Sequence, residues 1–309
     1  MWLYLAALLG LYFVFHWYRE RQTIPNLPDK YVLITGCDSG FGNQLARQLD
    51  RRGMWVLATC LTQKGAEQLK EATSQRLQTV ILDVTNKKSV AAMAQWVKEQ
   101  VGDRGLWGLV NNAGVGLPVA PNEWLTLDDF MRVLMVNLIG LIDVTLVLLP
   151  LLRKARGRII NMASALGRLS IVGGGYCISK FGVEAFSDSL RRDLSSFGVK
   201  VSIIETGFFK TGIAEREGFQ KNLERIWSQL PSDVKESYGE DHYHNFQKCI
   251  DGLIRTMKAN ISLVTDCMEH GLTSLHPRTR YTAGWDAKLL YIPLSYFPTI
   301  LADYLLTKL

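Results

Sequence analysis

The stretch YVLITGCDSGFG, residues 31–42, decides the fold of this chain. Its first four residues are apolar or β-branched and predict a short buried strand. Glycines at positions 36, 40 and 42 then allow a tight turn into a helix, whose N-terminal N–H groups would face a pyrophosphate. Glycine turns also serve purely structural purposes, so the place of this one directly after a strand is what favours a nucleotide site.

Further apolar runs follow at intervals that leave room for a helix between each pair. They occupy residues 55–58, 79–82, 106–110, 158–161 and 199–204, and amphipathic stretches such as 44–52 and 90–101 separate them. Continuous apolar strands that alternate with helices are typical of a parallel sheet with both faces covered. We therefore predict an α/β fold with a doubly wound parallel sheet.

The composition is that of an ordinary globular protein. The chain has 309 residues, of which 48% are hydrophobic and 21% charged, and a net charge of +6. These values exclude a disordered, collagen-like or disulfide-scaffold protein. The largest basic cluster, Arg153, Lys154, Arg156 and Arg158, has no interleaved aromatic residue. We interpret it as a solvated helix end followed by a turn, and we expect no nucleic-acid partner.

Cysteine and histidine spacing gives no sign of a metal site. The five cysteines are widely spaced and form no C-x-x-C pair, which argues against a zinc site and a disulfide framework. We interpret Cys177 as a packing residue. His242 and His244 lack a carboxylate or cysteine at a fitting spacing, so we expect surface histidines and no metal.

Residues 1–18 are predicted to form an N-terminal membrane anchor. Residues 1–17 contain no charged side chain, and as a helix they would span roughly 25 Å of a hydrocarbon core about 30 Å thick. No basic segment precedes the run and no small-residue cleavage site follows it, so we expect an uncleaved anchor. A buried core helix is the alternative. We interpret residues 19–29 as a linker.

The orientation of this anchor is weakly determined. Arg19 and Arg21 directly follow the apolar run, and the positive-inside rule then favours a cytosolic catalytic domain. Asn260 begins a glycosylation sequon, which matters only for a domain that faces the lumen. The side of the membrane on which the domain lies therefore stays open.

The C-terminal residues 289–309 are also apolar. Pro293 and Pro298 interrupt them and disfavour a single spanning helix. Residues 297–306 either lie in the membrane interface as a second contact or pack against the domain. We treat 289–309 as a membrane-associated segment.

Tyr176 and Lys180, four residues apart, share one face of a predicted helix. An ammonium about 4 Å from a phenol favours the phenolate by up to roughly 4 kcal/mol at an effective dielectric of about 20. Lys180 would thereby bring the pKa of Tyr176 toward neutrality, where a general base works best. Ser164 would hydrogen-bond the reacting oxygen, and Asn137 would position a water beside Lys180. The set predicts acid–base chemistry coupled to hydride transfer with a nicotinamide.

The glycine turn, the sequence NNAG at residues 111–114 and these four side chains occur in the order and spacing of the short-chain dehydrogenase/reductase family. The chain resembles that family over about residues 30–285. The resemblance implies a Rossmann sheet with strand order 3-2-1-4-5-6-7 within residues 30–288. It also implies a homodimer, since members often dimerise through two long helices. The catalytic residues that it implies are Asn137, Ser164, Tyr176 and Lys180.

Four stretches narrow the resemblance to the microsomal retinol dehydrogenase subgroup, which includes 3α-hydroxysteroid and 17β-hydroxysteroid type 6 enzymes. They are ITGCDSGFG at 34–42, GGGYC at 173–177, EAFSDSLRR at 184–192 and HPRTRY at 276–281. The resemblance implies that an anchored enzyme oxidises a retinoid or steroid, retinol or a 3α-hydroxysteroid, at the endoplasmic reticulum membrane. Residues 208–277 carry many charges and no clear strand, so we expect a helical insertion that caps the substrate.

The choice of cofactor depends on few residues. Asp83 ends the third predicted strand, where its carboxylate suits a hydrogen bond to an adenine amino group. Asp38 stands where an acid repels a 2′-phosphate, whereas Lys64 would attract one. We expect NAD, with NADP as the alternative.

One position departs from the family pattern. The family usually has Pro-Gly after the sixth strand, where this chain has Thr206 before Gly207, and the fixed φ of proline is lost. Thr211 still matches the family threonine that binds the nicotinamide amide. The expected cofactor-binding residues are Thr35, Gly36, Asp38, Ser39, Gly40, Phe41, Gly42, Asp83, Val84, Asn111, Ala113, Gly114, Tyr176, Lys180, Gly207 and Thr211.

Two other functions compete with this interpretation. An NADPH-dependent carbonyl or ketolipid reductase would use the same side chains in the opposite direction. A catalytically silent lipid-binding protein could also keep the fold. The complete catalytic set argues against a silent protein, and only the altered Thr206 favours it.

Overall fold

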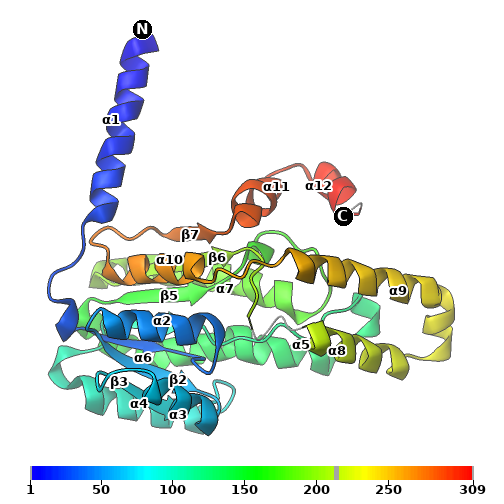
Figure 1. The fold of residues 1–309 in the computed structure, drawn as a ribbon, viewed down its shortest axis with the longest axis horizontal. Coiled ribbons are helices and arrows are strands. Elements are labelled where there is room, and N and C mark those ends of the chain that lie inside the picture. The colour runs from blue at the N-terminus through cyan, green and yellow to red at the C-terminus, as the bar shows by residue number, and fades with distance from the viewer. Residues whose placement is uncertain (1, 212–215, 308–309) are drawn as a thin grey trace.

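The computed structural model describes residues 2–211 and 216–307; parts of the predicted anchor, insertion and C-terminal segment, residues 1, 212–215 and 308–309, lie outside it. A seven-stranded parallel sheet forms the centre of the molecule (Figure 1), and its strand order 3-2-1-4-5-6-7 confirms the predicted fold class. The strands are β1 Tyr31–Ile34, β2 Trp55–Cys60, β3 Leu77–Ile81, β4 Gly108–Asn111, β5 Arg158–Met162, β6 Lys200–Thr206 and β7 Arg280–Ala283.

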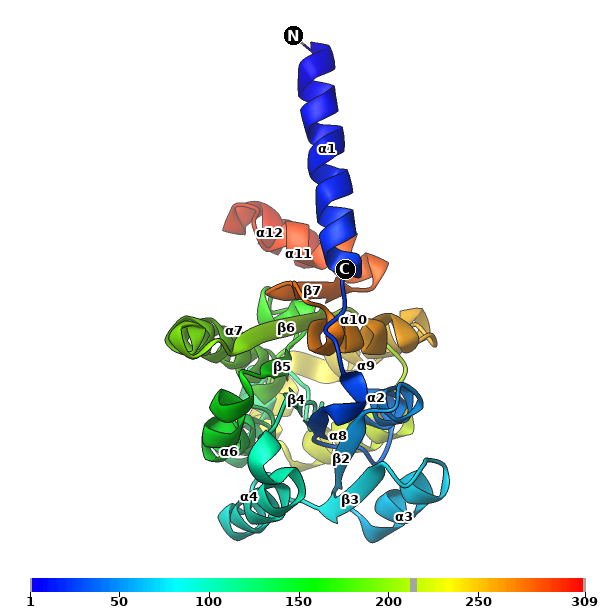
Figure 2. The same cartoon turned by 90° about the vertical axis from the view of Figure 1, so that its left-hand side faces the viewer.

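Helices cover both faces of the sheet (Figure 2). Along β1, Val32 and Ile34 join one apolar cluster, while Tyr31 and Leu33 join the other. The strand is therefore buried on both sides, which explains its unbroken apolar sequence. The helices are α2 Gly40–Arg51, α3 Gln63–Glu71 and α10 Ser262–Thr273 on one face, and α4 Lys87–Val101, α6 Leu141–Ala155 and α7 Gly175–Asp193 on the other, with α5 Leu127–Leu134 leading toward α6.

Each of the six strands predicted from the sequence is present, with ends that differ by at most two residues. The pattern does not reveal β7, because this edge strand alternates between buried and half-buried positions and is only four residues long. Its pairing with β6, from Ile203 opposite Arg280 to Thr206 opposite Ala283, is what places it in the sheet.

The predicted insertion divides into two parts. Helices α8 Arg216–Gln229 and α9 Ser232–Thr256 project beyond the carboxyl ends of the strands (Figure 1) and pack against Trp124 through Leu223 and Ile226. Helix α10, in contrast, packs on α2 and on the sheet through Val264 and Met268. Only α8 and α9 therefore form a cap, and α10 belongs to the sheet's helical layer.

The first helix, α1 Trp2–Arg21, projects away from the domain (Figure 1). It continues into the predicted linker, and the following residues are docked rather than loose. The backbone oxygen of Glu20 accepts a hydrogen bond from His270, and the Glu20 carboxylate pairs with Arg278. Ile24 N–H donates to the carbonyl of Thr273 at 2.8 Å. The base of α1 is thus bound to α10 and to the segment that precedes β7.

The C-terminal segment consists of the π-helical turn η8 Ala287–Tyr291, the short α11 Ile292–Leu294 and α12 Thr299–Leu306. Pro298 ends the connection before α12, as the sequence predicted for a broken segment. Phe297, Ile300 and Leu301 are exposed. Both α1 and α12 lie beyond the β7 edge of the sheet (Figures 1 and 2).

Among the described residues, one helical stretch, Leu127–Ala155, is long and apolar enough to cross a membrane by length and composition. It carries the inward-facing Val144 and Leu148, which pack against the sheet. Met131 and Leu146 on its outer side are exposed. The homodimer through two long helices stays a prediction.

The interpretation of the basic cluster is wrong for Arg158. This side chain lies in β5, is buried, and stacks over the ring of Trp107 with its guanidinium carbon 4.8 Å from the ring centroid. The sequence suggested a solvated turn, but the turn ends at Gly157 and the sheet begins at the next residue.

Candidate active site

The glycine turn between β1 and α2 packs directly on the end of β4. Gly36 and Gly40 have φ values of +71° and +61°, which favour glycine. A Cβ atom on Gly36 would lie 2.8 Å from the Cα of Ala113, and one on Gly42 would lie 2.4 Å from the carbonyl oxygen of Gly36. Only glycine therefore fits at these positions without moving the neighbouring backbone.

Polar side chains fasten this turn to β4. The Thr35 hydroxyl accepts hydrogen bonds from the N–H groups of Asn112 and Ala113, both at 3.0 Å. The Asn112 amide donates to the carbonyl oxygens of Thr35 and Gly36 at 2.9 and 3.0 Å. The turn and the end of β4 thus form one rigid edge.

Asn112, which the sequence analysis did not select, lines the cavity, whereas the predicted Asn111 does not. The Asn111 amide points into the core and donates to Thr145 and Asn161, both at 2.8 Å. Successive side chains at a strand end point in opposite directions, so only one of the two adjacent asparagines can face the cavity. The presence of two asparagines in the sequence was the only indication that Asn112 could be the one.

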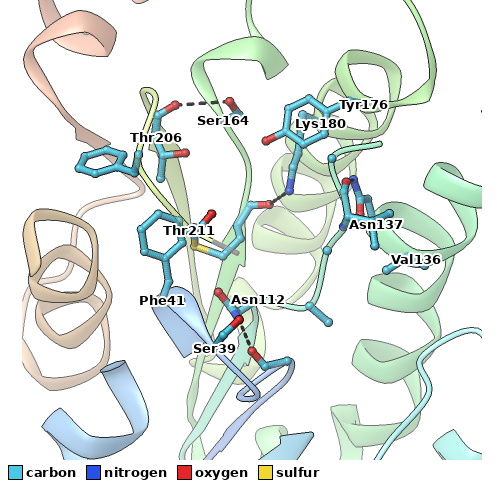
Figure 3. Close-up of a pocket in the computed structure, with 18 of the residues that line it drawn as sticks. Ser39, Phe41, Asn112, Val136, Asn137, Ser164, Tyr176, Lys180, Thr206 and Thr211 are labelled. Atoms are coloured by element: carbon cyan, nitrogen blue, oxygen red, sulfur yellow. Dashed lines mark hydrogen bonds between the residues drawn. The ribbon is translucent and has the colours of Figure 1, made fainter. Parts of the chain in front are cut away.

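A cavity of about 530 Å³ lies at the carboxyl ends of the strands (Figure 3). Thr35, Gly42 and Asn111 do not line it; they support the backbone beneath. The predicted residues that line it are Gly36, Asp38, Ser39, Gly40, Phe41, Asp83, Val84, Ala113, Gly114, Asn137, Ser164, Tyr176, Lys180, Gly207 and Thr211.

The first half of this cavity fits a dinucleotide. Ser39 precedes α2 but makes no side-chain capping hydrogen bond within the described residues, so N–H groups of the first turn remain available to a phosphate. Gly36, Gly40 and Gly114 leave the wall without side chains where a cofactor backbone would lie.

Asp38 is held rigidly at the end of β2. Its carboxylate accepts hydrogen bonds from the N–H groups of Leu61 and Thr62 at 2.8 and 2.9 Å, and from the Thr62 hydroxyl at 2.6 Å. Gly65 makes room for it, since a Cβ there would lie 2.6 Å from Asp38 Oδ1. Lys64 is exposed and does not line the cavity.

Asn137 is placed by an irregularity in its helix. The chain between α5 and α6 forms a π-helical stretch, Met135–Gly140, a feature common at functional sites. The Asn137 amide is buried, donates to the carbonyl of Val115 at 2.9 Å and to the Ser179 hydroxyl at 3.1 Å, and accepts from Val115 N–H at 2.8 Å. It thus fixes the segment after β4 against the helix that carries Tyr176.

Ser164, Tyr176 and Lys180 meet at the centre of the cavity wall (Figure 3). The Ser164 hydroxyl donates to the carbonyl of Thr206 at 3.3 Å, and Ser164 and Tyr176 both line the cavity. Lys180 Nζ donates to the carbonyl of Met162 at 2.7 Å and lies 5.6 Å from the centroid of the Tyr176 ring. The arrangement places a proton-accepting oxygen beside a second hydroxyl and an amine.

Burial controls the protonation of these groups. It raises the pKa of Tyr176 to about 12, against the opposing effect of the hydrogen bond with Ser164. It lowers the pKa of Lys180 to about 8. In this arrangement desolvation outweighs the attraction predicted from the sequence, because Lys180 is bound to Met162 and faces the ring.

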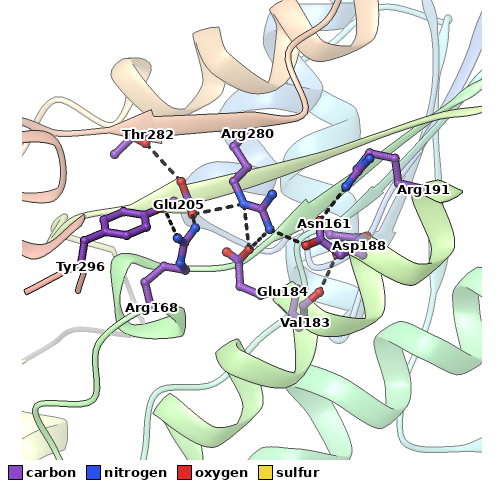
Figure 4. A network of polar contacts seen from close by, with 11 residues as sticks. Asn161, Arg168, Val183, Glu184, Asp188, Arg191, Glu205, Arg280, Thr282 and Tyr296 are labelled. Carbon is purple, nitrogen blue, oxygen red and sulfur yellow. Dashed lines mark hydrogen bonds and ion pairs between the residues drawn. The ribbon is translucent and has the colours of Figure 1, made fainter. Parts of the chain in front are cut away.

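A network of charged side chains connects α7 with β6 and β7 (Figure 4). Glu184, one turn after Lys180 on α7, pairs with Arg280 of β7 at 3.0 Å. Glu205, next to Thr206, pairs with Arg168 at 3.0 Å. Burial raises the pKa of Glu184 to about 7, the nearby Glu205 adds to the rise and Arg280 opposes it. The network joins α7, β6, β7 and the segment after Ser164.

The second half of the cavity is apolar. Its wall is formed by the segment after β4, the loops after β5 and β6, and the cap helices. The lining side chains are Val119, Leu166, Val172, Phe208, Phe219, Ile250, Leu253, Ile254 and Met257. A wall of this kind suits a large hydrophobic molecule that carries one polar group toward Ser164 and Tyr176.

Comparison with known proteins agrees with this geometry. Residues 30–222 match the family model described as short chain dehydrogenase. The chain belongs to the short-chain dehydrogenase family. Enzymes of this family are oxidoreductases that act on alcohols and carbonyls with NAD or NADP, so the cofactor class of this dehydrogenase is a nicotinamide dinucleotide.

Several curated relatives match almost the whole dehydrogenase. It is 62% identical over 303 residues to retinol dehydrogenase 7 of Rattus norvegicus, covering 98% of this chain and 96% of the relative. It is 63% identical to retinol dehydrogenase 16 of Homo sapiens, with the same coverage. It is 60% identical over 308 residues to 17-beta-hydroxysteroid dehydrogenase type 6 of Homo sapiens, covering 100% of this chain and 97% of the relative.

Solved structures share the fold. A short-chain dehydrogenase from Streptomyces avermitilis has a TM-score of 0.70 and 23% sequence identity, and covers 90% of this chain and 96% of its own. A short chain dehydrogenase/reductase from Burkholderia phymatum in complex with NAD has a TM-score of 0.69 and 25% identity, with coverages of 86% and 92%.

The buried Tyr176–Lys180 pair predicts a specific pH dependence. Alcohol oxidation should accelerate as the pH rises, because the phenolate accepts the proton, and level off near pH 8, where Lys180 loses its charge. Lys180→Met removes the cation that favours the phenolate. We expect its pH–rate profile to move to higher pH and its rate at neutral pH to fall by about 10² or more. Profiles of kcat against pH that superimpose for the two proteins would contradict this role.

Proposed function

We propose that this dehydrogenase oxidises the hydroxyl of a lipophilic alcohol, retinol or a 3α-hydroxysteroid, with NAD as the hydride acceptor. The observation that carries the proposal is the meeting of Ser164, Tyr176 and Lys180 with an apolar cavity wall. The relatives named retinol dehydrogenase and 17-beta-hydroxysteroid dehydrogenase, at about 60% identity over the whole chain, support the same substrate class.

Each catalytic side chain has a distinct task in this proposal. Tyr176 accepts the hydroxyl proton of the substrate at its phenolic oxygen, and Ser164 holds that oxygen by a hydrogen bond. Lys180 stabilises the negative charge on Tyr176 when its own amine is protonated. Asn137 holds the segment at Val115 in place and positions a water beside Lys180. When bound, the cofactor supplies the hydride acceptor.

A substrate assay with a matched tyrosine control tests the proposal. Detergent-solubilised protein should form NADH with all-trans-retinol, a 3α-hydroxysteroid or both. Tyr176→Phe should lower kcat by about 10² to 10⁴ while cofactor binding persists, because only the proton acceptor is lost. Tyr238→Phe, which removes an exposed hydroxyl bonded to Glu123, is the control and should keep its activity. Equal activity of wild type and Tyr176→Phe would favour a catalytically silent protein.

The preference for NAD is proposed from the position of Asp38. Its carboxylate is fixed beside the cavity by Leu61 and Thr62 and would repel the 2′-phosphate of NADP. Lys64 does not line the cavity and therefore does not offset this repulsion.

Substitution of Asp38 tests this preference. Asp38→Lys should raise the ratio of NADP to NAD turnover by about tenfold or more, because it exchanges repulsion for attraction. Asp38→Asn keeps the size of the side chain, loses the charge, and should give an intermediate ratio. An unchanged ratio of kcat/KM values in Asp38→Lys would remove Asp38 from cofactor selection.

We also propose that α1 anchors the enzyme in the endoplasmic reticulum membrane, with the catalytic domain on the cytosolic side. Its apolar side chains Leu8, Leu11 and Phe13 are exposed, and Arg19 and Arg21 lie in its last turn. Helix α12 lies beyond the same edge of the sheet (Figure 1), and the exposed Ile300 within it and Phe297 just before it would contact the membrane interface.

Charges placed in α1 test the anchor. Each lysine at a helix centre costs about 2.5 to 3.5 kcal/mol of insertion free energy, so Leu8→Lys with Leu11→Lys should release the protein from microsomes at alkaline pH. Leu127→Lys changes a leucine of similar exposure at the start of α5, outside α1, and should leave the protein in the membrane fraction. Retention of the double variant would show that α1 is not the anchor.

A further inference from the structure

The loop that follows β6, residues 207–211, is held by two residues, Asp286 and Lys258, that the sequence analysis did not select. We call this segment the β6 loop. Phe208 N–H donates to Asp286 Oδ2 at 2.9 Å. Lys258 N–H donates to the carbonyl of Phe208 at 3.1 Å, and the carbonyl of Lys258 accepts from Lys210 N–H at 2.8 Å. The loop is therefore paired on one side with η8 and on the other with the chain after α9.

Asp286 packs directly against the backbone of this loop. A Cβ atom on Gly207 would lie 2.2 Å from Asp286 Oδ1, and one on Gly284 would lie 2.5 Å from the same atom. The two glycines thus admit the carboxylate to a place that no larger residue would leave open. Burial by itself would raise the pKa of Asp286, but hydrogen bonds from Lys258 and from Phe208 N–H hold it below its ordinary value, so the carboxylate is ionised.

Lys258 connects the same carboxylate to the substrate cap. Its ammonium forms an ion pair with Asp286. It stands just beyond the end of α9, where Leu253, Ile254 and Met257 line the apolar half of the cavity. If Leu253, Ile254 and Met257 shift around a substrate, Lys258 would shift with them, and its contacts with Phe208 and Asp286 would change.

The contacts continue to the glycine turn. Lys258 Nζ lies 5.6 Å from the ring centroid of Phe209, and the Phe209 ring meets that of Phe41 edge-on with centroids 5.9 Å apart. Phe41 belongs to the first turn of α2 and lines the cavity (Figure 3). An unbroken series of contacts thus runs from the cap to the predicted phosphate site.

We propose that Asp286 and Lys258 are positioning residues that hold the β6 loop against the cofactor and couple cofactor binding to occupation of the apolar cavity. We call these two residues the clamp. The clamp restricts the conformation of the loop in place of the proline that the family usually has at the position of Thr206. Because coupling between two binding sites is reciprocal, the alcohol tightens cofactor binding by the same factor as the cofactor tightens alcohol binding. The inference rests on the proposed function, since it assigns Gly207 and Thr211 to the cofactor.

Binding of NADH, measured by titration calorimetry on the full-length detergent-solubilised protein, tests this role without turnover. NADH and an alcohol cannot react, so affinity is measured with and without a saturating 3α-hydroxysteroid, and then with all-trans-retinol. We expect the alcohol to tighten NADH binding about fivefold or more in the wild type. Asp286→Ala should weaken NADH binding about tenfold, because the β6 loop loses a charged hydrogen-bond acceptor.

The remaining variants separate the two residues' contributions. Asp286→Asn keeps an oxygen for Phe208 N–H and should recover part of the affinity. Lys258→Met should reduce the tightening by the alcohol toward a factor of one, since the ion pair that connects the end of α9 to Asp286 is removed. Lys154→Met, which breaks an exposed pair with Asp103 far from the cavity, is the matched control and should behave as wild type.

Circular dichroism and thermal melting establish that each variant is folded. A folded Asp286→Ala that binds NADH as tightly as the wild type would overturn the clamp and leave the proposed function standing. An alcohol that changes NADH affinity equally in wild type and Lys258→Met would overturn the coupling. A wild-type protein that binds neither NADH nor NADPH would overturn the clamp and the proposed function together.

Discussion

The close approach of the glycine turn to the end of β4 is the constraint on which the rest of the site depends. Gly36 lies on the backbone of Ala113, and the Asn112 amide bonds two carbonyl oxygens of the turn. This contact aims the N-terminus of α2 at the edge where the parallel strands end. A side chain on Gly36 would push α2 away, and the first half of the cavity would lose its wall.

The proposed catalytic groups at that edge are buried, and burial disfavours their charged forms. The buried carboxylates near them are paired with arginines. Tyr176 and Lys180 are buried, so each favours its neutral form. Behind them, Glu184 and Glu205 are balanced by arginines from β7 and from the segment after Ser164 (Figure 4). Buried carboxylates without these partners would be strongly unfavourable beside the catalytic helix.

The apolar parts of the molecule form a consistent set. The cap helices line the cavity with hydrophobic side chains, and α1 and α12 expose hydrophobic side chains beyond the β7 edge. In the proposed function, a lipid-soluble alcohol and an enzyme anchored at a bilayer would meet without the alcohol crossing water. The base of α1 is bound through Glu20 to His270 and Arg278, so this helix, the proposed anchor, is joined to the domain by more than a loose chain.

The sequence by itself predicted six of the seven strands and the glycine turn, and it singled out the proposed catalytic set, because these depend on short-range periodicity and on residues with special backbone or acid–base properties. It also marked Thr206 as unusual. Only the tertiary structure decided which asparagine of the pair at 111 and 112 faces the cavity, since neighbouring side chains at a strand end diverge. It likewise decided that Asp286, some eighty residues away, stabilises the β6 loop. Contacts between distant segments arise from packing, and no local pattern of residues encodes them.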